Sequence, residues 1–352
     1  MHHPFLLAWR SGTSTFTLPT SGSTGTPKLI TLTRAQMEAS ARLTGQMFNL
    51  AAGDRALVCL NTAYIAGIMM LVRGEVLGLD LTVVEPSSNP LRSFDPATTR
   101  FAFAAFVPLQ VQTMLADLDA QGQPVVLPIL NGMKAMLVGG AATSPALEAA
   151  LQVVQAPVYA TYGMTETVSH VAIRRLNGPR RSDLFTVLPG VVVGTDERGC
   201  LHITAAATND ERVQTNDVVE LIEQAEPATP PHRQTGGVRF RLLGRADSII
   251  NTGGVKVQPE AVEAVLQRLL AEWQLAPRLF VAGVPDERLG QRVVVFCEGQ
   301  PLTDEQWRQV QQTVKQSVGP FAAPKAWQVV GTFAETATGK IDRRAVLAEH
   351  MK

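Results

Sequence analysis

Nine residues near the start of the chain combine groups that bind phosphate. The segment Thr20-Ser21-Gly22-Ser23-Thr24-Gly25-Thr26-Pro27-Lys28 follows a predicted strand. Glycine lets a backbone approach an anion closely, amides and hydroxyls donate hydrogen bonds to phosphate oxygens, and lysine adds a compact positive charge. The segment is not a Walker A loop, because Pro27 and Leu29 occupy two positions that GxxxxGK[ST] reserves for other residues. For the segment alone, a solvated Gly/Ser turn is the simpler interpretation.

Later segments carry further groups suited to a nucleotide. Tyr162-Gly163-Met164-Thr165-Glu166-Thr167 offers an aromatic ring for a base, a hydroxyl for phosphate and a carboxylate for Mg²⁺. Asp217, in Thr215-Asn216-Asp217, is suited to bind two ribose hydroxyls. Thr336-Ala337-Thr338-Gly339-Lys340 presents a lysine on a glycine-containing loop. Each segment also has an ordinary alternative, namely a core tyrosine with a turn, a plain turn and a solvated lysine.

Composition limits the class of protein. The 352 residues include 31 basic and 31 acidic side chains, so the zero net charge indicates neither nucleic acid nor an anionic membrane as a partner. The three cysteines, Cys59, Cys200 and Cys297, lack the spacing of a zinc site or a disulfide framework. The longest apolar run, Leu57 to Val72, is interrupted by polar residues and is too short to span a membrane. We expect a cytoplasmic protein.

The alternation of strand-like and helical segments predicts an α/β fold with parallel or mixed sheets covered by helices. Thr33 and Gln36 have capping-box spacing and open a helix to about Phe48, and Ser144-Pro145 opens another. The predicted strands are 55–60, 81–84, 103–107, 135–138, 157–160, 279–282 and 293–297. Helices are also expected from Pro259 and from Thr303.

Residues 223–237 break the pattern and fit either an exposed loop or a linker between domains. A better boundary lies at Gly244-Arg245-Ala246-Asp247. We therefore expect a large domain at residues 1–244 and a small α+β domain at residues 245–352.

The order of the motifs is more specific than any one of them. TSGSTGTPK, Gly139-Gly140-Ala141-Ala142, YGMTET, TND, GRADSIINTGGVKVQPEAVE and TATGKIDR follow one another along the chain. In that order they resemble the core motifs of the acyl-adenylate-forming superfamily, which includes acyl-CoA synthetases, peptide-synthetase adenylation domains and luciferases. The resemblance covers residues ~15 to 345. It implies a large adenylate-forming domain, shortened at its N-terminus, and a mobile C-terminal lid.

The resemblance also implies roles for matching residues. The β and γ phosphates of ATP would be held by Ser21, Gly22, Ser23, Thr24, Gly25, Thr26 and Lys28. Gly140, Ala141, Tyr162 and Gly163 would surround the adenine, Thr165 would contact the α phosphate, and Glu166 would bind Mg²⁺. Asp217 and Arg245 would hold the ribose, Asp247 would be the hinge, Lys340 would act in adenylation, and Gly253 and Gly254 would line the CoA tunnel.

The implied reaction has two steps at one site. A substrate carboxylate attacks the α phosphorus of ATP and expels pyrophosphate, and the lid then rotates so that the CoA thiol attacks the acyl-adenylate. ATP, Mg²⁺, CoA and a small carboxylic acid are the expected partners. The family pattern also has departures here, since Tyr64 stands where many members carry a histidine and Asn216 replaces the glycine of TGD.

The loop begins at Thr20, whereas typical members have a much longer segment before it. Short members with an apolar stretch like YIAGIMMLVRG resemble o-succinylbenzoate:CoA ligases of menaquinone biosynthesis. For such an aromatic diacid, Tyr64 would form a pocket wall, and His170 or Arg73 would lie near the second carboxylate. A core tyrosine and a surface arginine are the alternatives. A ligase for another aryl or short-chain acid, an adenylation domain that loads a carrier protein, and a nucleotide-binding scaffold without chemistry also stay open.

Overall fold

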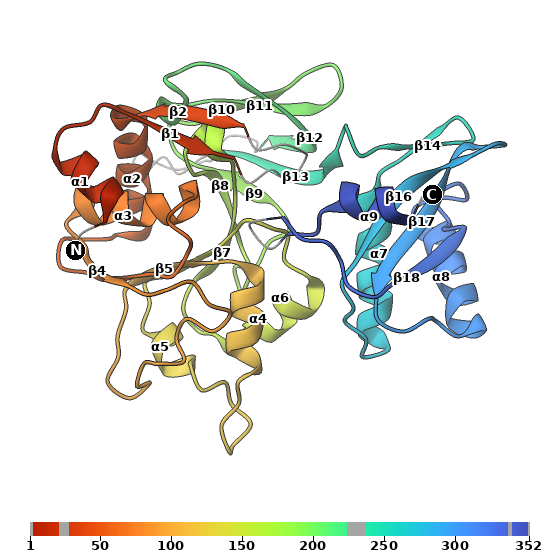
Figure 1. Cartoon of the computed structure of the whole chain (residues 1–352), viewed down its shortest axis with the longest axis horizontal. Coiled ribbons are helices and arrows are strands. Elements are labelled where there is room, and N and C mark those ends of the chain that lie inside the picture. Colours follow the sequence, from red (N-terminus) through yellow and green to blue (C-terminus); the bar gives the residue numbers. More distant parts are fainter. Residues whose placement is uncertain (1–2, 21–27, 224–236, 337–339, 351–352) are drawn as a thin grey trace.

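Two β-sheets organise the chain in the computed structural model, which describes residues 3–20, 28–223, 237–336 and 340–350 (Figure 1). The larger sheet has 11 strands in the order β10-β11-β12-β13-β9-β8-β7-β6-β5-β3-β4. Its strands are β3 (Arg55–Val58), β4 (Asp80–Val83), β5 (Phe103–Phe106), β6 (Ala135–Val138), β7 (Val158–Gly163), β8 (His170–Arg175), β9 (Phe185–Val187), β10 (Val192–Thr195), β11 (Cys200–Thr204), β12 (Val213–Glu223) and β13 (Val238–Arg245).

One half of this sheet is parallel and the other antiparallel. The strands β4, β3, β5, β6 and β7 pair in parallel, whereas β8 to β13 pair antiparallel. The mixed α/β sheet expected from the sequence is confirmed. The glycines after β6 and the turn after β7 both lie at the carboxyl ends of parallel strands, where open α/β sheets bind ligands.

Helices cover both faces of the parallel half (Figure 1). One face carries α2 (Arg34–Phe48) and α3 (Ile65–Leu77), and the other carries α4 (Pro108–Ala116), α5 (Leu127–Asn131) and α6 (Pro145–Ala150), which continues into η1 (Leu151–Val153). Burial alternates accordingly along β6, since Ala135 and Leu137 pack in the α2–α3 core while Met136 and Val138 pack in the other. A strand buried on both faces must be apolar throughout, which explains the sequence AMLV.

The helix starts predicted from capping residues are confirmed. Thr33 accepts a hydrogen bond from the Gln36 backbone at 3.2 Å, and the Gln36 side chain accepts one from the Thr33 backbone at 2.8 Å, which completes the capping box of α2. Ser144, directly before Pro145, is the N-cap of α6, and its side chain accepts a hydrogen bond from the Leu147 amide. The apolar run from Leu57 divides into the end of β3 and the buried helix α3, and no helix in the described ranges is long and apolar enough to cross a membrane.

A separate hairpin and a short helix lie at the N-terminal side. Strands β1 (Thr15–Pro19) and β2 (Leu29–Thr33) pair antiparallel, from Thr15 opposite Thr33 to Pro19 opposite Leu29. Helix α1 (Pro4–Arg10) packs against this hairpin through the rings of Phe5, Trp9 and Phe16. The hairpin therefore brings both ends of the predicted phosphate loop together.

The smaller sheet contains β14 (Ile250–Thr252), β15 (Val255–Val257), β16 (Leu279–Asp286), β17 (Gly290–Glu298) and β18 (Ala326–Val330). Helices α7 (Pro259–Glu272) and α8 (Asp304–Ser317) pack on it through Val262, Leu266, Val310 and Val314, and α9 (Arg343–His350) follows near the C-terminus. The helices expected from Pro259 and Thr303 are confirmed. In chain order, β13 is the last strand of the larger sheet and ends at Arg245, and β14, the first strand of the smaller sheet, begins at Ile250. The division at 244/245 stays a prediction, and 224–236 of the expected loop lie outside the described residues.

Candidate active site

The ends of the predicted phosphate loop are joined by two hydrogen bonds. The Thr20 amide donates to the Lys28 carbonyl at 2.7 Å, and the Lys28 amide donates to Thr20 Oγ1 at 2.9 Å. These bonds extend the β1–β2 ladder by one residue pair, so Thr20 and Lys28, at the two ends of the loop, are held side by side. Lys28 is exposed. Ser21, Gly22, Ser23, Thr24, Gly25 and Thr26 lie outside the described residues.

The YGMTET segment forms a tight turn at the end of β7. Thr165–Thr167 makes the 3₁₀ turn η2, which packs against β2. The Thr167 hydroxyl accepts from the Met164 amide at 3.0 Å and donates to the Ser169 carbonyl at 2.8 Å. Gly163 is required here, because a Cβ at this position would lie 2.1 Å from the Ser169 carbonyl oxygen. The turn thus holds Thr165 and Glu166 beside the strand that follows the phosphate loop.

Val168, next in the chain, has an unusual backbone conformation. Its φ and ψ are 65° and −52°, and the Ser169 amide donates to the Thr167 carbonyl at 2.7 Å. This is a γ-turn of the rare, strained type, and a β-branched residue disfavours positive φ strongly. Because the Val168 side chain is fully buried, the surrounding core fixes the turn. Such strain concentrates at functional sites and supports a site at this turn.

Asp217, Arg245 and Tyr162 form one hydrogen-bonded network across three strands. Asp217 and Arg245 are opposite one another on β12 and β13. Arg245 Nη1 donates to Asp217 Oδ1 at 3.0 Å, and Tyr162 Oη donates to Asp217 Oδ2 at 2.6 Å. Arg245 also donates to both carboxylate oxygens of Asp247, at 2.9 and 2.8 Å. The structure therefore brings together four residues that the sequence placed in the nucleotide site and at the hinge.

This network has clear electrostatic consequences. Burial raises the pKa of Tyr162, and the neighbouring Asp217 carboxylate raises it further, so the phenol stays a hydrogen-bond donor. The hydrogen bond from Arg245 lowers the pKa of Asp247. The Tyr162 ring is held edge-on by Phe240, at 5.2 Å between ring centroids, and by Phe185 at 5.9 Å. Tyr162 thus reaches the site already oriented.

The glycines after β6 lie next to the end of β7. Gly139 leaves no room for a side chain, since a Cβ would lie 2.3 Å from Thr161 Oγ1, and Gly140 has a φ of +84°. The β6 and β7 strands are parallel neighbours, so Gly140 and Ala141 emerge at the same sheet edge as Tyr162. Gly140 and Ala141 are both exposed, so their surface is accessible to the flat ring of an adenine.

Lys340 belongs to a segment that leaves the smaller sheet and extends toward the larger one (Figure 1). The Thr336 amide donates to the Lys340 carbonyl at 2.8 Å, and the Lys340 amide donates to Thr336 Oγ1 at 3.2 Å. The Lys340 residue is half-buried, and burial lowers its pKa. Gly253 and Gly254, in contrast, stay with the smaller sheet, where the Gly253 amide donates to the Leu289 carbonyl at 2.8 Å.

Glu166 is suited to a magnesium ion bound with ATP. Its half-buried carboxylate forms no hydrogen bond or ion pair with any residue whose position the structure gives. Mg²⁺ sites with nucleotides commonly use one or two carboxylates together with phosphate oxygens and water. Within the described ranges, no group of three or more His, Cys, Asp and Glu side chains could hold a metal ion by itself. The donor set therefore fits an ion shared with phosphate.

A buried basic cluster lies directly beyond the strained turn. Arg73 is 2% exposed and donates from Nη2 to Ser169 Oγ at 2.8 Å and from Nε to Thr44 Oγ1 at 3.2 Å. No described carboxylate pairs with Arg73, and burial lowers its pKa to about 10. The alternative of a surface arginine is wrong.

His170 belongs to the same cluster. Its Nδ1 lies 3.2 Å from Ser169 Oγ, and its buried Nε2 has no hydrogen-bond partner within the described part of the chain. Burial, with a smaller contribution from the Arg73 charge, lowers the His170 pKa to about 3, so the ring is neutral. Sequence reasoning missed Ser169, whose hydroxyl contacts both Arg73 and His170. Tyr64, half-buried, lies at the start of α3, on the helix that carries Arg73.

Comparison with known families identifies the class. The sequence model of the AMP-binding enzyme family matches residues 10–194, and that of the AMP-binding enzyme C-terminal domain matches residues 262–340. The first match covers more than half of the chain, so the protein belongs to the AMP-binding enzyme family. Fold, site and family together define an AMP-forming acid–CoA ligase.

Two individual relatives with the same enzyme name are similar to most of this chain. The chain is 26% identical over 330 residues to 2-succinylbenzoate--CoA ligase from Escherichia coli (strain K12), covering 93% of this chain and 67% of that protein. It is 29% identical over 354 residues to a probable 2-succinylbenzoate--CoA ligase from Mycobacterium tuberculosis (strain H37Rv), covering 93% and 82%.

Solved structures share the fold. A crystal structure of an acyl-CoA synthetase (AMP-forming)/AMP-acid ligase II-like protein from Dyadobacter fermentans matches with 41% identity and a TM-score of 0.60, covering 98% of this chain and 92% of that one. O-succinylbenzoate Coenzyme A Synthetase from Bacillus subtilis, in complex with ATP and magnesium ion, matches with a TM-score of 0.71, covering 93% and 68%. Its 18% identity supports the fold alone.

Proposed function

We propose that this enzyme converts 2-succinylbenzoate, ATP and CoA into 2-succinylbenzoyl-CoA, AMP and pyrophosphate, as a step of menaquinone biosynthesis. The family and the ordered motifs in the site support the ligase reaction. The buried Arg73–Ser169–His170 cluster supports the choice of an aromatic diacid, because Arg73 gives it a positive charge that no carboxylate of the described residues neutralises. ATP and CoA are substrates of the cytoplasm, where we place the reaction.

In the first step, the chain's own residues would position ATP and the acid. Asp217 would accept hydrogen bonds from the ribose hydroxyls, with Arg245 and Tyr162 fixing its orientation. Ser21, Gly22, Ser23, Thr24, Gly25, Thr26 and Lys28 would bind the β and γ phosphates, Thr165 the α phosphate, and Gly140, Ala141, Tyr162 and Gly163 the adenine. The nucleophile is already a carboxylate anion, so no general base is needed.

Charge is the main obstacle to this step. A Mg²⁺ ion held by Glu166 would offset negative charge on the phosphate oxygens. Lys340 would donate to the reacting oxygens, and losing one such donor typically costs about 3 to 4 kcal/mol, or about 10²- to 10³-fold in rate. The half-burial of Lys340 supports this role, because a partly desolvated ammonium interacts more strongly with an anion.

The second step would use a different orientation of residues 245–352. In our proposal, that segment rotates about Asp247 as a lid on residues 1–244, which withdraws Lys340 and brings Gly253 and Gly254 to the site. Both glycines have positive φ, 59° and 80°, and a Cβ on Gly254 would meet no described atom within 4 Å. The turn therefore presents bare backbone, which suits a narrow channel for pantetheine.

The second carboxylate of the substrate would bind at the basic cluster. Ser169 follows Glu166 by three residues, and Arg73, on α3, reaches the same place because its Nη2 lies 2.8 Å from Ser169 Oγ. An acid with its reacting carboxylate at the α phosphate would place its far carboxylate there. His170, being neutral, can donate from Nε2 when Nδ1 accepts from Ser169. Tyr64 would contribute a wall for the ring.

An exchange assay across an acid panel tests this assignment. The enzyme is incubated with ATP, Mg²⁺, labelled pyrophosphate and either 2-succinylbenzoate, benzoate, 4-phenylbutanoate or acetate. We expect exchange with 2-succinylbenzoate to exceed that with each monoacid by tenfold or more, as one charge-assisted contact predicts. Exchange only with monoacids refutes the substrate, and no exchange with any acid refutes the ligase reaction.

A ligase for a short-chain acid is the second candidate. The chain is 28% identical over 365 residues to acetyl-coenzyme A synthetase from Penicillium chrysogenum, covering 94% of this chain and 53% of that protein. The same panel decides between them, because acetate would then be the best acid.

A further inference from the structure

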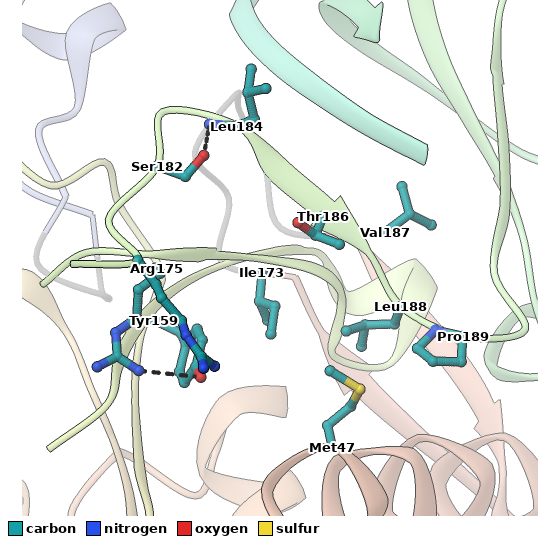
Figure 2. A pocket seen from close by; sticks show the side chains of 11 residues that line it. Met47, Tyr159, Ile173, Arg175, Ser182, Leu184, Thr186, Val187, Leu188 and Pro189 are labelled. Carbon is teal, nitrogen blue, oxygen red and sulfur yellow. Dashed lines mark hydrogen bonds between the residues drawn. The ribbon is translucent and has the colours of Figure 1, made fainter. Parts of the chain in front are cut away.

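A cavity lies on β7 and β8, the two strands that also carry the candidate site, but at the other end of this strand pair (Figure 2). It has a volume of about 230 Å³, and Tyr159 of β7 and Arg175 of β8 face it as cross-strand partners. The candidate site is at the opposite end of this strand pair, where Gly163 is opposite His170. The cavity is therefore separate from the residues that bind ATP and the acid.

The cavity is largely apolar. Side chains from the end of α2, from β8 and from the segment around β9 surround it (Figure 2). They are Met47, Ile173, Leu184, Val187, Leu188 and Pro189. Such walls can bury a ring or a branched hydrocarbon, because removing apolar surface from water stabilises the complex.

Two arginines supply positive charge at one side of these walls. Arg175 donates from Nε to the Asn177 carbonyl at 2.9 Å and from Nη1 to Tyr159 Oη at 3.3 Å, and its guanidinium lies 5.2 Å from the Tyr159 ring centroid. These contacts fix the guanidinium, and Nη2 forms no hydrogen bond with a residue that the structure describes. Arg180 is exposed and lines the same cavity.

The two arginines next to Arg175 and Arg180 in the sequence differ from them, because both form ion pairs. Arg174 and Arg181 pair with Glu148 at 2.6 and 3.3 Å. Arg175 and Arg180, each adjacent in sequence to one of them, have no carboxylate partner among the residues with assigned positions. Of these four arginines, the two without a carboxylate partner among the described residues are the two that line the cavity.

We propose that this cavity is a second ligand site, which binds an aromatic carboxylate with its ring on the apolar walls and its carboxylate between Arg175 and Arg180. The geometry supports an anion rather than a neutral ligand, because neither guanidinium has a carboxylate partner within the described ranges. Phe48 separates this site from the acid cluster, since its ring centroid lies 5.2 Å from that of Tyr159 and 6.4 Å from that of His170. The proposal does not depend on which acid the enzyme activates.

The test uses 1-naphthoate as the probe, titrated into the full chain by isothermal calorimetry. We expect the double variant Arg175→Gln, Arg180→Gln to bind it at least about tenfold more weakly, since each charge-assisted contact contributes measurably. Arg92→Gln, which changes an exposed arginine far along the chain from the cavity, should bind as the wild type does. The neutral 1-naphthalenemethanol should bind weakly to all of them.

Two further variants keep the result interpretable. Arg180→Gln alone changes an exposed loop residue and tests the site if the double variant fails to fold. Arg73→Met separates this cavity from the acid cluster, and it should leave naphthoate binding intact. Naphthoate binding that is unchanged in both Arg180→Gln and the double variant overturns the proposal. Naphthoate binding that is lost in Arg73→Met but kept in the other variants overturns it as well. Failure of the ligase function would instead appear in the exchange assay, with naphthoate binding retained.

Discussion

Replacing Arg73 with methionine should stabilise the protein while weakening its use of a diacid. Burial lowers the Arg73 pKa from its ordinary value to about 10, which corresponds to about 3 kcal/mol by which the core disfavours the charged form. Methionine fills a similar volume without this cost. The substitution loses hydrogen bonds to two hydroxyls, but Thr44 Oγ1 still donates to the Ser40 carbonyl at 3.0 Å, and Ser169 Oγ still reaches His170.

We therefore expect a net gain of about 1 to 3 kcal/mol in the free energy of unfolding, in line with other buried charges replaced by apolar residues. The sign follows from the pKa. A base with a lowered folded pKa destabilises the fold at every pH below that value, and the penalty fades only as the pH rises above about 10 toward the ordinary pKa of arginine. The gain should thus be constant between about pH 6 and 9.

Denaturant unfolding measures the gain, with Arg42→Met as a control. Arg42 is an exposed arginine on α2 that pairs with Glu38 at 2.8 Å, and its loss should change stability by less than about 0.5 kcal/mol.

Exchange assays on Arg73→Met measure how the substitution changes the use of each acid. We expect kcat/KM for 2-succinylbenzoate to fall about 10- to 100-fold, and kcat/KM for benzoate to stay unchanged, because only the diacid contacts the arginine. An Arg73→Met protein that is less stable than the wild type would refute the argument from desolvation. An equal loss with both acids would refute the carboxylate site.

Three other substitutions test the remaining geometry. Lys340→Ala should abolish adenylate formation but leave thioester formation from preformed acyl-adenylate largely intact, and equal loss of both steps in single-turnover assays would contradict the lid argument. Because burial lowers the Lys340 pKa, wild-type adenylation should also decline with rising pH earlier than an ordinary lysine would allow, a decline absent from the second step. Tyr162→Phe removes the 2.6 Å bond to Asp217 and should raise the KM for ATP about tenfold in steady-state assays, whereas an unchanged KM would exclude Asp217 orientation as its role. Gly163→Ala would place a Cβ 2.1 Å from the Ser169 carbonyl and should reduce the adenylation rate by at least about tenfold, so full activity in the exchange assay would show that the turn is free to shift.

Local chemistry made much of the fold predictable. Thr33 with Gln36, and Ser144 with Pro145, fixed helix starts because the capping bonds form within a few residues. Strand 135–138 was predicted with its observed bounds, since an apolar run before paired glycines has few alternatives. The order of the sheet was not predicted, because pairing between β9 and β13 depends on residues more than fifty positions apart.

The site shows the same division. The motifs predict Tyr162, Asp217 and Arg245 in one nucleotide site, and the structure shows that Asp217 is hydrogen-bonded to the other two. Their roles toward ATP stay a prediction. Ser169 was missed because a lone serine has no signature, and its role appears only when α3 brings Arg73 to it. The γ-turn at Val168 was equally hidden, since valine normally indicates a strand and here the tertiary core overrides that preference.

Product analysis tests the central claim most directly. The enzyme is incubated with ATP, Mg²⁺, CoA and 2-succinylbenzoate, and AMP, pyrophosphate and the thioester are quantified by chromatography with mass spectrometry. We predict equal amounts of AMP, pyrophosphate and 2-succinylbenzoyl-CoA in the wild type, and none of them in Lys340→Ala. ADP and phosphate in place of AMP and pyrophosphate, or AMP formed without any acyl-CoA, would contradict it.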